Sequence, residues 1–356
     1  MIHVHNLMEK AVYDNIFPGG VLLAAEKGEI LFCKAYGHAD IFANTKMNVD
    51  TVFDLASLTK PLAASAALMK LTEETSGLPE WELGNIIPEI CSTDKAHIKI
   101  KHLLSHTSGF PDYRPYYLKI NKVTDENPKT VLRELLIKES LVSFPGKKVI
   151  YSDLGFMMLE WVIEKLTATA LDCFLDKEIY SPLGIKNLFF PGISYKKEKH
   201  FAATELCPWR RKLLKGAVHD DNAYAAGGIQ GHAGLFGTIK DVFILLCELL
   251  NAVKGNKNQG VFKKKVVEYF FRPYRNTGRS LGFDMPSPEG SSSGCFFCKN
   301  SVGHLGFTGT SFWMDIDRYI ILILLTNRIH PYRHNYKIKI FRPVIHNAVM
   351  EKIMNK

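Results

Sequence analysis

The sequence lacks any uninterrupted apolar run of the roughly 18 residues that a membrane-spanning helix needs. The longest apolar run, "YIILILLT" at 319–326, has the length of a buried strand. The first 20 residues include acidic side chains and lack the apolar core of a signal peptide. We therefore expect a cytoplasmic protein without a membrane span.

The chain also has few cysteines, and their arrangement argues against a disulfide framework. There are 7, an odd number, scattered from Cys33 to Cys298, which is typical of reduced thiols. The one close pair is Cys295 and Cys298 in "CFFC", without a second pair or suitably spaced histidines. We expect no metal site and no cofactor.

A nucleic-acid-binding signature is missing as well, although the formal net charge is +9. Lysines and arginines are dispersed, and the clusters "WRRKLLK" (209–215) and "FKKK" (262–265) are short. This pattern favours a solvated basic surface over a nucleic-acid partner. Anionic cell-wall fragments stay open as a substrate class.

Apolar periodicity predicts strands at both ends of the chain and helices between them. We expect a helix at about 4–14, then a hairpin of two half-buried strands around Lys27 and Gly28. Residues 304–327 predict two strands joined by a turn at 315–318, and a helix at about 338–354 closes the chain. The predicted organisation is one domain, 1–356, with a sheet lobe from about 1–56 and 225–356 and a helical lobe at about 57–224. Residues 287–296 predict a surface loop.

The stretch "FDLASLTKPLAASAALMKL" (53–71) places Ser57 three residues before Lys60 at the start of a predicted helix. Residues three apart share a helix face, so both side chains can reach one cleft. A serine hydroxyl needs a nearby base, and a lysine accepts a proton only if its pKa is lowered. The alternative is that Lys60 is a solvated helix charge.

Two further stretches contain groups suited to the same chemistry. In "FPGKKVIYSDLGF" (144–156), Tyr151 stands between a short strand and a helix, and a lysine ammonium beside it would lower its pKa. In "GHLGFTGTS" (303–311), a glycine-rich edge strand allows close approach of a substrate, and its amides can donate to an oxyanion. Taken singly, Tyr151 would be a half-buried core aromatic, and His304 a surface histidine in a turn.

In this order, S-x-x-K, Y-S-D and H-x-G, the chain resembles the serine β-lactamase and penicillin-binding protein superfamily, in particular its class C β-lactamase-like branch. The stretch "LLSHTSGF" (103–110) resembles the family's signature after the nucleophile helix. The stretch "HDDNAYAAGGIQGHAGLFGTIKDV" (219–242) resembles a subgroup with murein-recycling amidases, D,D-peptidases and esterases. The resemblance implies an α/β (α+β) fold, with an antiparallel sheet from both chain ends, flanking helices and an inserted helical lobe.

The resemblance also assigns roles. It makes Ser57 the acylated nucleophile, Lys60 its partner, and Tyr151 the general base that later activates water. It places the oxyanion and substrate-binding residues at Asp153, His304, Gly306 and Phe307. The backbone N–H groups of Phe307 and Ser57 would form the oxyanion hole.

Two positions depart from the pattern of class C β-lactamases. Asp153 replaces an asparagine, and a carboxylate beside Lys60 favours the charged lysine, which shifts the role of base to Tyr151. His304 replaces a lysine that meets the substrate carboxylate, so we expect inefficient β-lactam hydrolysis. His106, His219 and His232 lack the spacing of a metal set, and we expect structural roles for them.

The sequence thus predicts a serine hydrolase that cleaves an amide or ester through a Ser57 acyl-enzyme. The candidate substrates are cell-wall-derived peptides or muropeptides, D-amino-acid peptides, β-lactams and small esters. The competing hypothesis is a catalytically weak or silent module that binds peptidoglycan fragments.

Overall fold

A computed structural model describes residues 1–123, 125–193, 199–255 and 260–355. Within them lies a six-stranded antiparallel sheet in the order β3-β2-β1-β11-β10-β9, built from both ends of the chain. Its strands are β1 (Gly19–Glu26), β2 (Glu29–Asp40), β3 (Thr45–Lys46), β9 (Val302–Leu305), β10 (Ser311–Asp315) and β11 (Ile320–Thr326). A smaller sheet contains β4 (Phe53–Asp54), β8 (Phe236–Gly237) and β5 (Leu188–Phe189), and β6 (Leu206–Cys207) pairs with β7 (Lys212–Leu213).

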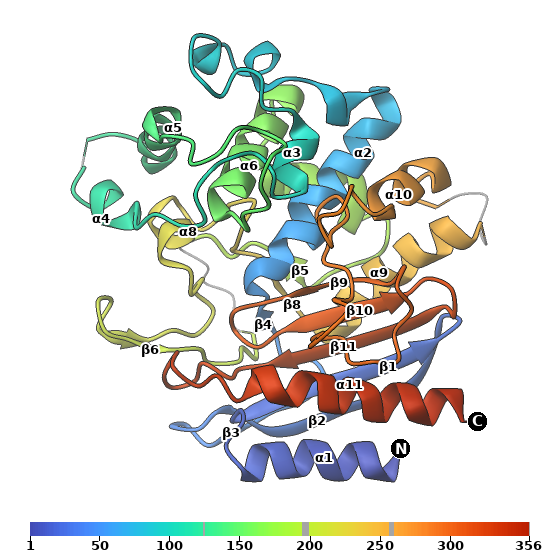
Figure 1. Cartoon of the computed structure of the whole chain (residues 1–356). Helices are drawn as coiled ribbons and strands as arrows, with labels where there is room; N and C mark the ends of the chain where they lie inside the picture. The colour runs from blue at the N-terminus through green and yellow to red at the C-terminus, as the bar shows by residue number, and fades with distance from the viewer. Residues whose placement is uncertain (124, 194–198, 256–259, 356) are drawn as a thin grey trace.

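Helices cover both faces of the main sheet (Figure 1). α1 (Ile2–Tyr13) and α11 (Ile338–Met354) pack together on one face. The other α-helices are α2 (Ala66–Glu74), α3 (Ile100–Leu104), α4 (Tyr117–Ile120), α5 (Pro128–Lys138), α6 (Asp153–Thr167), α7 (Leu171–Leu175), α8 (Asp221–Ala225), α9 (Ile239–Lys254) and α10 (Lys264–Phe271). Shorter 3₁₀ turns occupy Ala56–Leu58, Leu78–Glu80, Leu83–Asn85 and Pro88–Ile90, and π-helical segments occupy Lys60–Ser65 and Asp176–Tyr180. None of the helices in the described residues is both long and apolar enough to cross a bilayer.

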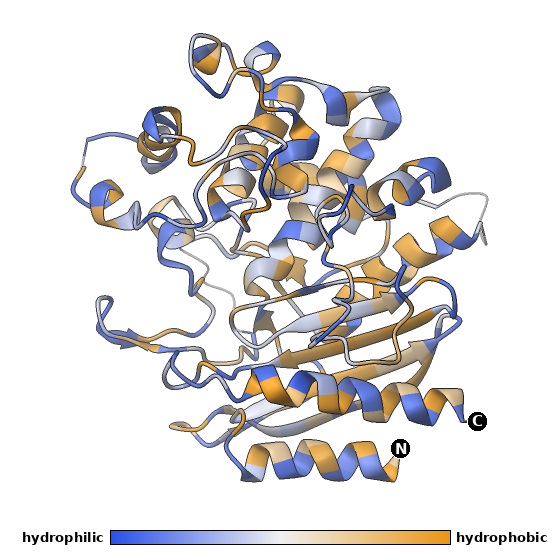
Figure 2. Ribbon diagram, in the orientation of Figure 1, coloured by the Kyte–Doolittle hydropathy of each residue, from blue (hydrophilic) through white to orange (hydrophobic). Residues whose placement is uncertain are grey.

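The central strands are apolar on both faces, which explains why they lie between two layers of helices. In β1, Leu22 and Ala24 face the cluster formed with α1 and α11, whereas Val21 and Leu23 face the cluster formed with the other helices. Figure 2 shows β1 and β11 as the apolar centre of the sheet, while α1 and α11 alternate between apolar and polar faces. Burying each such leucine or valine contributes roughly 1.5–3 kcal/mol.

The terminal elements confirm the predicted pattern, with two corrections. The hairpin turns at Lys27 and Gly28 as expected, but β1 is buried on both faces instead of half-buried, because it pairs with β2 and β11 under helices on each side. The predicted strand from 304 is interrupted, because Gly306 and Gly309 form a turn between β9 and β10. The turn at 315–318 and the closing helix agree with expectation. The predicted surface loop at 287–296 is exposed at 287–290, but residues 291–296 are half-buried or buried except Cys295. The division into lobes at 56/57 and 224/225 stays a prediction.

Candidate active site

Ser57 lies in a tight turn between strand β4 and the helical segment that leads to α2. Ala56 has φ of 49°, and its N–H donates to Asp54 Oδ1 at 2.9 Å, which fixes the turn. Residues 51–60 are buried except Ser57, which is half-buried. Ser57 therefore presents its side chain to a cavity of about 280 Å³.

The expected helix after Ser57 exists, but it is not α-helical in its first turns. Ser57 belongs to the 3₁₀ turn Ala56–Leu58, Lys60–Ser65 is π-helical, and α2 begins only at Ala66. Pro61 provides the reason, because it has no N–H to donate to the carbonyl of Ser57 and its ring would crowd that carbonyl. Tighter and wider turns of this kind are frequent at functional sites.

Lys60 is buried and bridges the serine to two other segments. Its Nζ donates to Ser57 Oγ at 3.1 Å, to Asp153 Oδ1 at 2.7 Å and to the carbonyl of His232 at 3.2 Å. Burial alone would lower the pKa of Lys60, but the Asp153 carboxylate and the Tyr151 phenol outweigh it and raise the pKa. Lys60 is therefore a buried ammonium and not a solvated helix charge, and Asp153 favours its charged form as expected.

Tyr151 joins the same cluster, although its pKa shifts opposite to our expectation. Its side chain hydrogen-bonds to Ser57 and Lys60, and Lys60 Nζ lies 5.0 Å from the centre of its ring. Burial raises the pKa of Tyr151; the Lys60 ammonium opposes this, and Asp153 reinforces it. The prediction of a lowered pKa was wrong, because the sequence does not reveal how completely the phenol is buried. Tyr151 is a neutral phenol in the resting site.

His106, in the "LLSHTSGF" stretch, holds the segment that carries Tyr151. Its ring stacks on Tyr151 with centroids 4.4 Å apart, and its Nδ1 accepts the N–H of Ser152 at 3.0 Å. Its carbonyl accepts the N–H of Ile150 at 2.8 Å, so His106 binds both residues that flank Tyr151. Burial lowers the pKa of His106 well below its usual value, which keeps Nδ1 available as an acceptor.

The turn that follows β9 is hydrogen-bonded to the backbone beside Ser57. Thr308 Oγ1 donates to the Asp54 carbonyl at 2.8 Å, and Thr310 Oγ1 donates to the Leu55 carbonyl at 3.0 Å. A Cβ on Gly306 would stand 2.7 Å from the Leu55 carbonyl, so only glycine fits this close approach. Phe307, which is 44% exposed, lines the cavity with Ser57.

His304 does not face the cavity, contrary to the contact expected of it. It lies on β9 and is 1% exposed, and its Nδ1 donates to the carbonyl of Leu305 at 2.9 Å. Burial, with the Lys60 and Arg279 charges, lowers its pKa to about 4 despite the nearby Asp284. His304 is thus neither a surface histidine in a turn nor a cationic contact for a substrate carboxylate.

The opposite wall contains His219 and His232, for which we expected structural roles, and other residues that the sequence reasoning did not single out. His219, Asp220, Asp221, His232, Tyr113 and Arg333 line the cavity with Ser57, Tyr151 and Asp153. His232 Nε2 lies 3.0 Å from Asp220 Oδ1, and His219 Nε2 lies 3.0 Å from Glu205 Oε2. The sequence signal for this wall was the stretch 219–242, because most of the wall residues lie in it.

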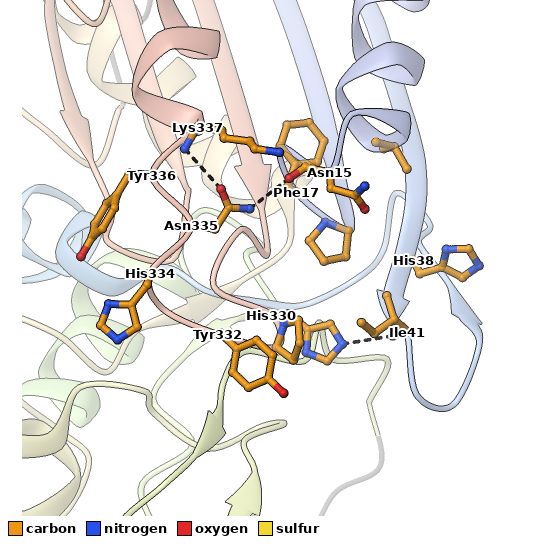
Figure 3. Close-up of a pocket in the computed structure, with 13 residues that line it drawn as sticks. Asn15, Phe17, His38, Ile41, His330, Tyr332, His334, Asn335, Tyr336 and Lys337 are labelled. Atoms are coloured by element: carbon orange, nitrogen blue, oxygen red, sulfur yellow. Dashed lines mark hydrogen bonds between the residues drawn. The ribbon is translucent and has the colours of Figure 1, made fainter.

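A larger cavity, of about 550 Å³, lies elsewhere and includes none of the residues predicted for the site (Figure 3). Its polar side chains hold segments together: Asn335 donates to the carbonyls of Asn15 and Ile16, and His330 accepts the N–H of Ile41. Over the described ranges, no cluster of three or more His, Cys, Asp or Glu side chains is placed to hold a metal ion. Cys295 and Cys298 are free thiols.

Comparisons with known proteins agree on one family. The family model for beta-lactamase matches residues 4–341. The chain is 33% identical to the N-acetylmuramyl-L-alanine amidase of Bacillus subtilis, over 88% of this chain and 78% of that protein. It is 30% identical to the "Putative D-alanyl-D-alanine carboxypeptidase" of Escherichia coli K12, over 91% and 82% of the two chains.

Solved structures show the same fold. The hydrolase EstCE1, which has promiscuous acyltransferase activity, superposes with a TM-score of 0.76 at 20% identity, over 96% of this chain and 98% of that one. The octameric penicillin-binding protein homologue from Pyrococcus abyssi gives 0.77 at 18% identity, over 99% and 77%. The predicted α/β (α+β) β-lactamase-like fold is confirmed. The chain belongs to the beta-lactamase family and is a hydrolase that acts on amide or ester bonds.

Proposed function

We propose that this hydrolase cleaves its substrate through an acyl-enzyme on Ser57. The observation that carries the proposal is the position of Lys60 Nζ, within hydrogen-bond distance of both Ser57 Oγ and Asp153 Oδ1. A serine becomes a nucleophile when a neighbouring group takes its proton, and the Tyr151 phenol is hydrogen-bonded to it. The charged Lys60 stabilises negative charge that develops on either oxygen.

In the first half of the reaction, Ser57 Oγ forms a bond to the carbonyl carbon. The proton of Ser57 passes to the Tyr151 oxygen as the phenol's own proton passes to the leaving nitrogen or oxygen. Such a relay suits a neutral phenol, because no net charge is placed on Tyr151. The oxyanion accepts hydrogen bonds from the N–H groups of Ser57 and Phe307, and the leaving group departs as a neutral amine or alcohol.

The second half repeats these steps with water as the nucleophile. Water gives a proton to the Tyr151 oxygen, attacks the acyl carbon, and the Tyr151 proton returns to Ser57 Oγ. The acid product leaves, and the resting protonation states are restored. No metal or cofactor is needed for this sequence of bonds.

For the substrate, we propose an amide of peptidoglycan origin. The relatives named as a muramyl-alanine amidase and a D-alanyl-D-alanine carboxypeptidase support this class. β-Lactams are disfavoured, because Asp153 adds a carboxylate to the cavity, whereas His304 is buried and does not line it. The cytoplasmic location stays a prediction, to be checked by cell fractionation.

One observation favours the competing hypothesis of a silent binding module. The pKa values of Lys60 and Tyr151 are both raised, so neither group is a ready base at neutral pH. A silent module would bind peptidoglycan fragments and return them intact, whereas an enzyme would release product.

The test is a substrate panel read by mass spectrometry. N-acetylmuramyl peptides, D-alanyl-D-alanine peptides, short-chain p-nitrophenyl esters and a penicillin are incubated with the wild type, with Ser57→Ala, and with Ser181→Ala. Ser181 is an exposed serine far along the chain and serves as the matched control. We expect product from the wild type and the control but none from Ser57→Ala, and equal turnover in all three would contradict the proposal.

A further inference from the structure

Asp220 is held in the cavity wall by one of its two carboxylate oxygens. It is the N-cap of α8 (Figure 1), where Oδ1 accepts the N–H of Ala223 at 2.7 Å and faces His232 Nε2 at 3.0 Å. Its side chain is 27% exposed and lines the cavity with Ser57. No hydrogen bond to Oδ2 is found among the described residues. The group is therefore fixed in place with one acceptor oxygen unused.

The neighbours of Asp220 also favour its ionised form. Burial alone would raise its pKa, but the charge and hydrogen bond of His232 and the Ala223 amide outweigh it, so the pKa lies below its usual value. A carboxylate that is already bonded and charged is a strong acceptor for a cationic donor.

The lysine and the arginine at the cavity pair with other carboxylates, whereas Asp220 Oδ1 faces His232. Lys60 pairs with Asp153. Arg333 pairs with Glu205, through Nε at 2.8 Å to both carboxylate oxygens. Asp220 Oδ2 therefore offers a ligand a carboxylate oxygen that has no hydrogen bond among the described residues.

A second observation concerns His232, which contacts Asp220 Oδ1 and has a buried ring nitrogen without a partner among the described residues. His232 is 1% exposed and lines the cavity, yet its Nδ1 has no hydrogen-bond partner in the part of the chain that the structure describes. Buried polar atoms in folded proteins are nearly always paired, and unpaired ones occur where a ligand or water completes the site. His232 is also the side chain that positions Asp220, through the contact of its Nε2 with Asp220 Oδ1.

We propose that Asp220 determines specificity, by accepting a hydrogen bond from a protonated amine of the substrate and repelling a carboxylate at the same place. This inference rests on the proposed function, since it names the charge that the Ser57 cavity selects. The Asp220 charge favours amide substrates that have an ammonium group near the scissile bond. It disfavours carboxypeptidase-type substrates, in which a free carboxylate lies beside the scissile bond. Asp220 need not take part in the proton transfers.

The variant Asp220→Asn isolates the charge. Asparagine caps a helix about as well as aspartate, and its Oδ1 still accepts from Ala223 and His232. Asp50→Asn is the matched control, because it removes the same charge from an exposed carboxylate that pairs with Lys240 outside the cavity. Thermal unfolding of both variants verifies that the fold is kept.

Binding is measured by titration calorimetry in a Ser57→Ala background, so that turnover plays no part. The ligands are three p-nitroanilides of D-alanine that differ only at the amino group: the free ammonium, the neutral N-acetyl form and the anionic N-succinyl form. We expect the ammonium form to bind most tightly and the N-succinyl form most weakly. Asp220→Asn should reduce the ratio of these affinities by roughly tenfold or more, while Asp50→Asn leaves it unchanged.

An unchanged ratio in Asp220→Asn overturns the inference, as does preference for the N-succinyl form or no binding of the ammonium form. These outcomes are independent of catalysis. If Ser57 in the wild type forms an acyl-enzyme but the ratio does not change, the specificity inference alone fails. If the ratio changes but Ser57 never reacts, the proposed function alone fails.

Discussion

Lys60 Nζ lies 2.7 Å from Asp153 Oδ1, on a side chain that is fully buried beside the half-buried Ser57. The carboxylate raises the pKa values of both Lys60 and Tyr151, and so sets the protonation state from which the reaction begins.

The first prediction concerns that carboxylate. Asp153→Asn removes a charge that raises the pKa values of Lys60 and Tyr151, so both values should fall. The proposed relay needs a charged Lys60 and a neutral Tyr151, and activity is lost as pH rises through the lower of the two values. The basic limb of kcat/KM against pH should therefore move to lower pH. An unmoved basic limb contradicts this account, and Asp317→Asn at an exposed position is the control.

The second prediction concerns the phenol of Tyr151. Tyr151→Phe removes the oxygen that relays protons, and loss of such a group costs roughly 100- to 10,000-fold in kcat. The ring stacked 4.4 Å from His106 remains, so the midpoint of thermal unfolding should change little. The value of kcat and the midpoint of thermal unfolding are measured on the same preparation of the variant. A kcat within about threefold of the wild type would show that the phenol does not relay protons.

The third prediction concerns the support of Tyr151 by His106. His106 has φ of 58°, and asparagine tolerates that conformation, so His106→Asn removes the ring without adding backbone strain. The buried N–H of Ser152 loses its acceptor, which should lower the free energy of unfolding by about 1–3 kcal/mol. Urea denaturation measures this, with the exposed His97→Asn as control. Equal losses in both variants would mean that His106 has no special role.

The fourth prediction is a pH dependence of stability. The pKa of His304 is lowered to about 4 by burial, whereas an unfolded histidine titrates near pH ~6.5. Between these values the unfolded chain binds more protons than the folded one, so the free energy of unfolding falls as pH decreases from about 6.5 to about 4. His304→Asn should reduce that slope in urea denaturation at a series of pH values. His97→Asn should keep the wild-type slope, and a steeper slope in His304→Asn would oppose the argument.

Local patterns predicted the terminal elements well. The 3.6-residue and two-residue periodicities of apolar side chains indicated α1, the hairpin and α11, because these depend on neighbours in sequence. The spacing of Ser57 and Lys60 was informative for the same reason, since both lie on one helical segment.

Features that depend on long-range packing could not be predicted in this way. The pKa of Tyr151 depends on burial by segments far along the chain, and the sequence gives no measure of that burial. The burial of His304 depends on the pairing of β9 with β10, where it lies opposite Phe312, and on its packing near Tyr151. Asp220 and His232 lie 3.0 Å apart although they are 12 residues apart in the sequence. We expected a structural role for His232, in a loop that should face the cleft, and we did not single out Asp220.

The most direct test of the central claim is the mass of the intact protein after exposure to a fluorophosphonate, with Ser57→Ala beside the wild type. We predict one adduct on the wild type, located at Ser57 by peptide mapping, and none on the variant. The absence of an adduct on the wild type, or an equal adduct on both proteins, would contradict the account of Ser57 as the activated nucleophile.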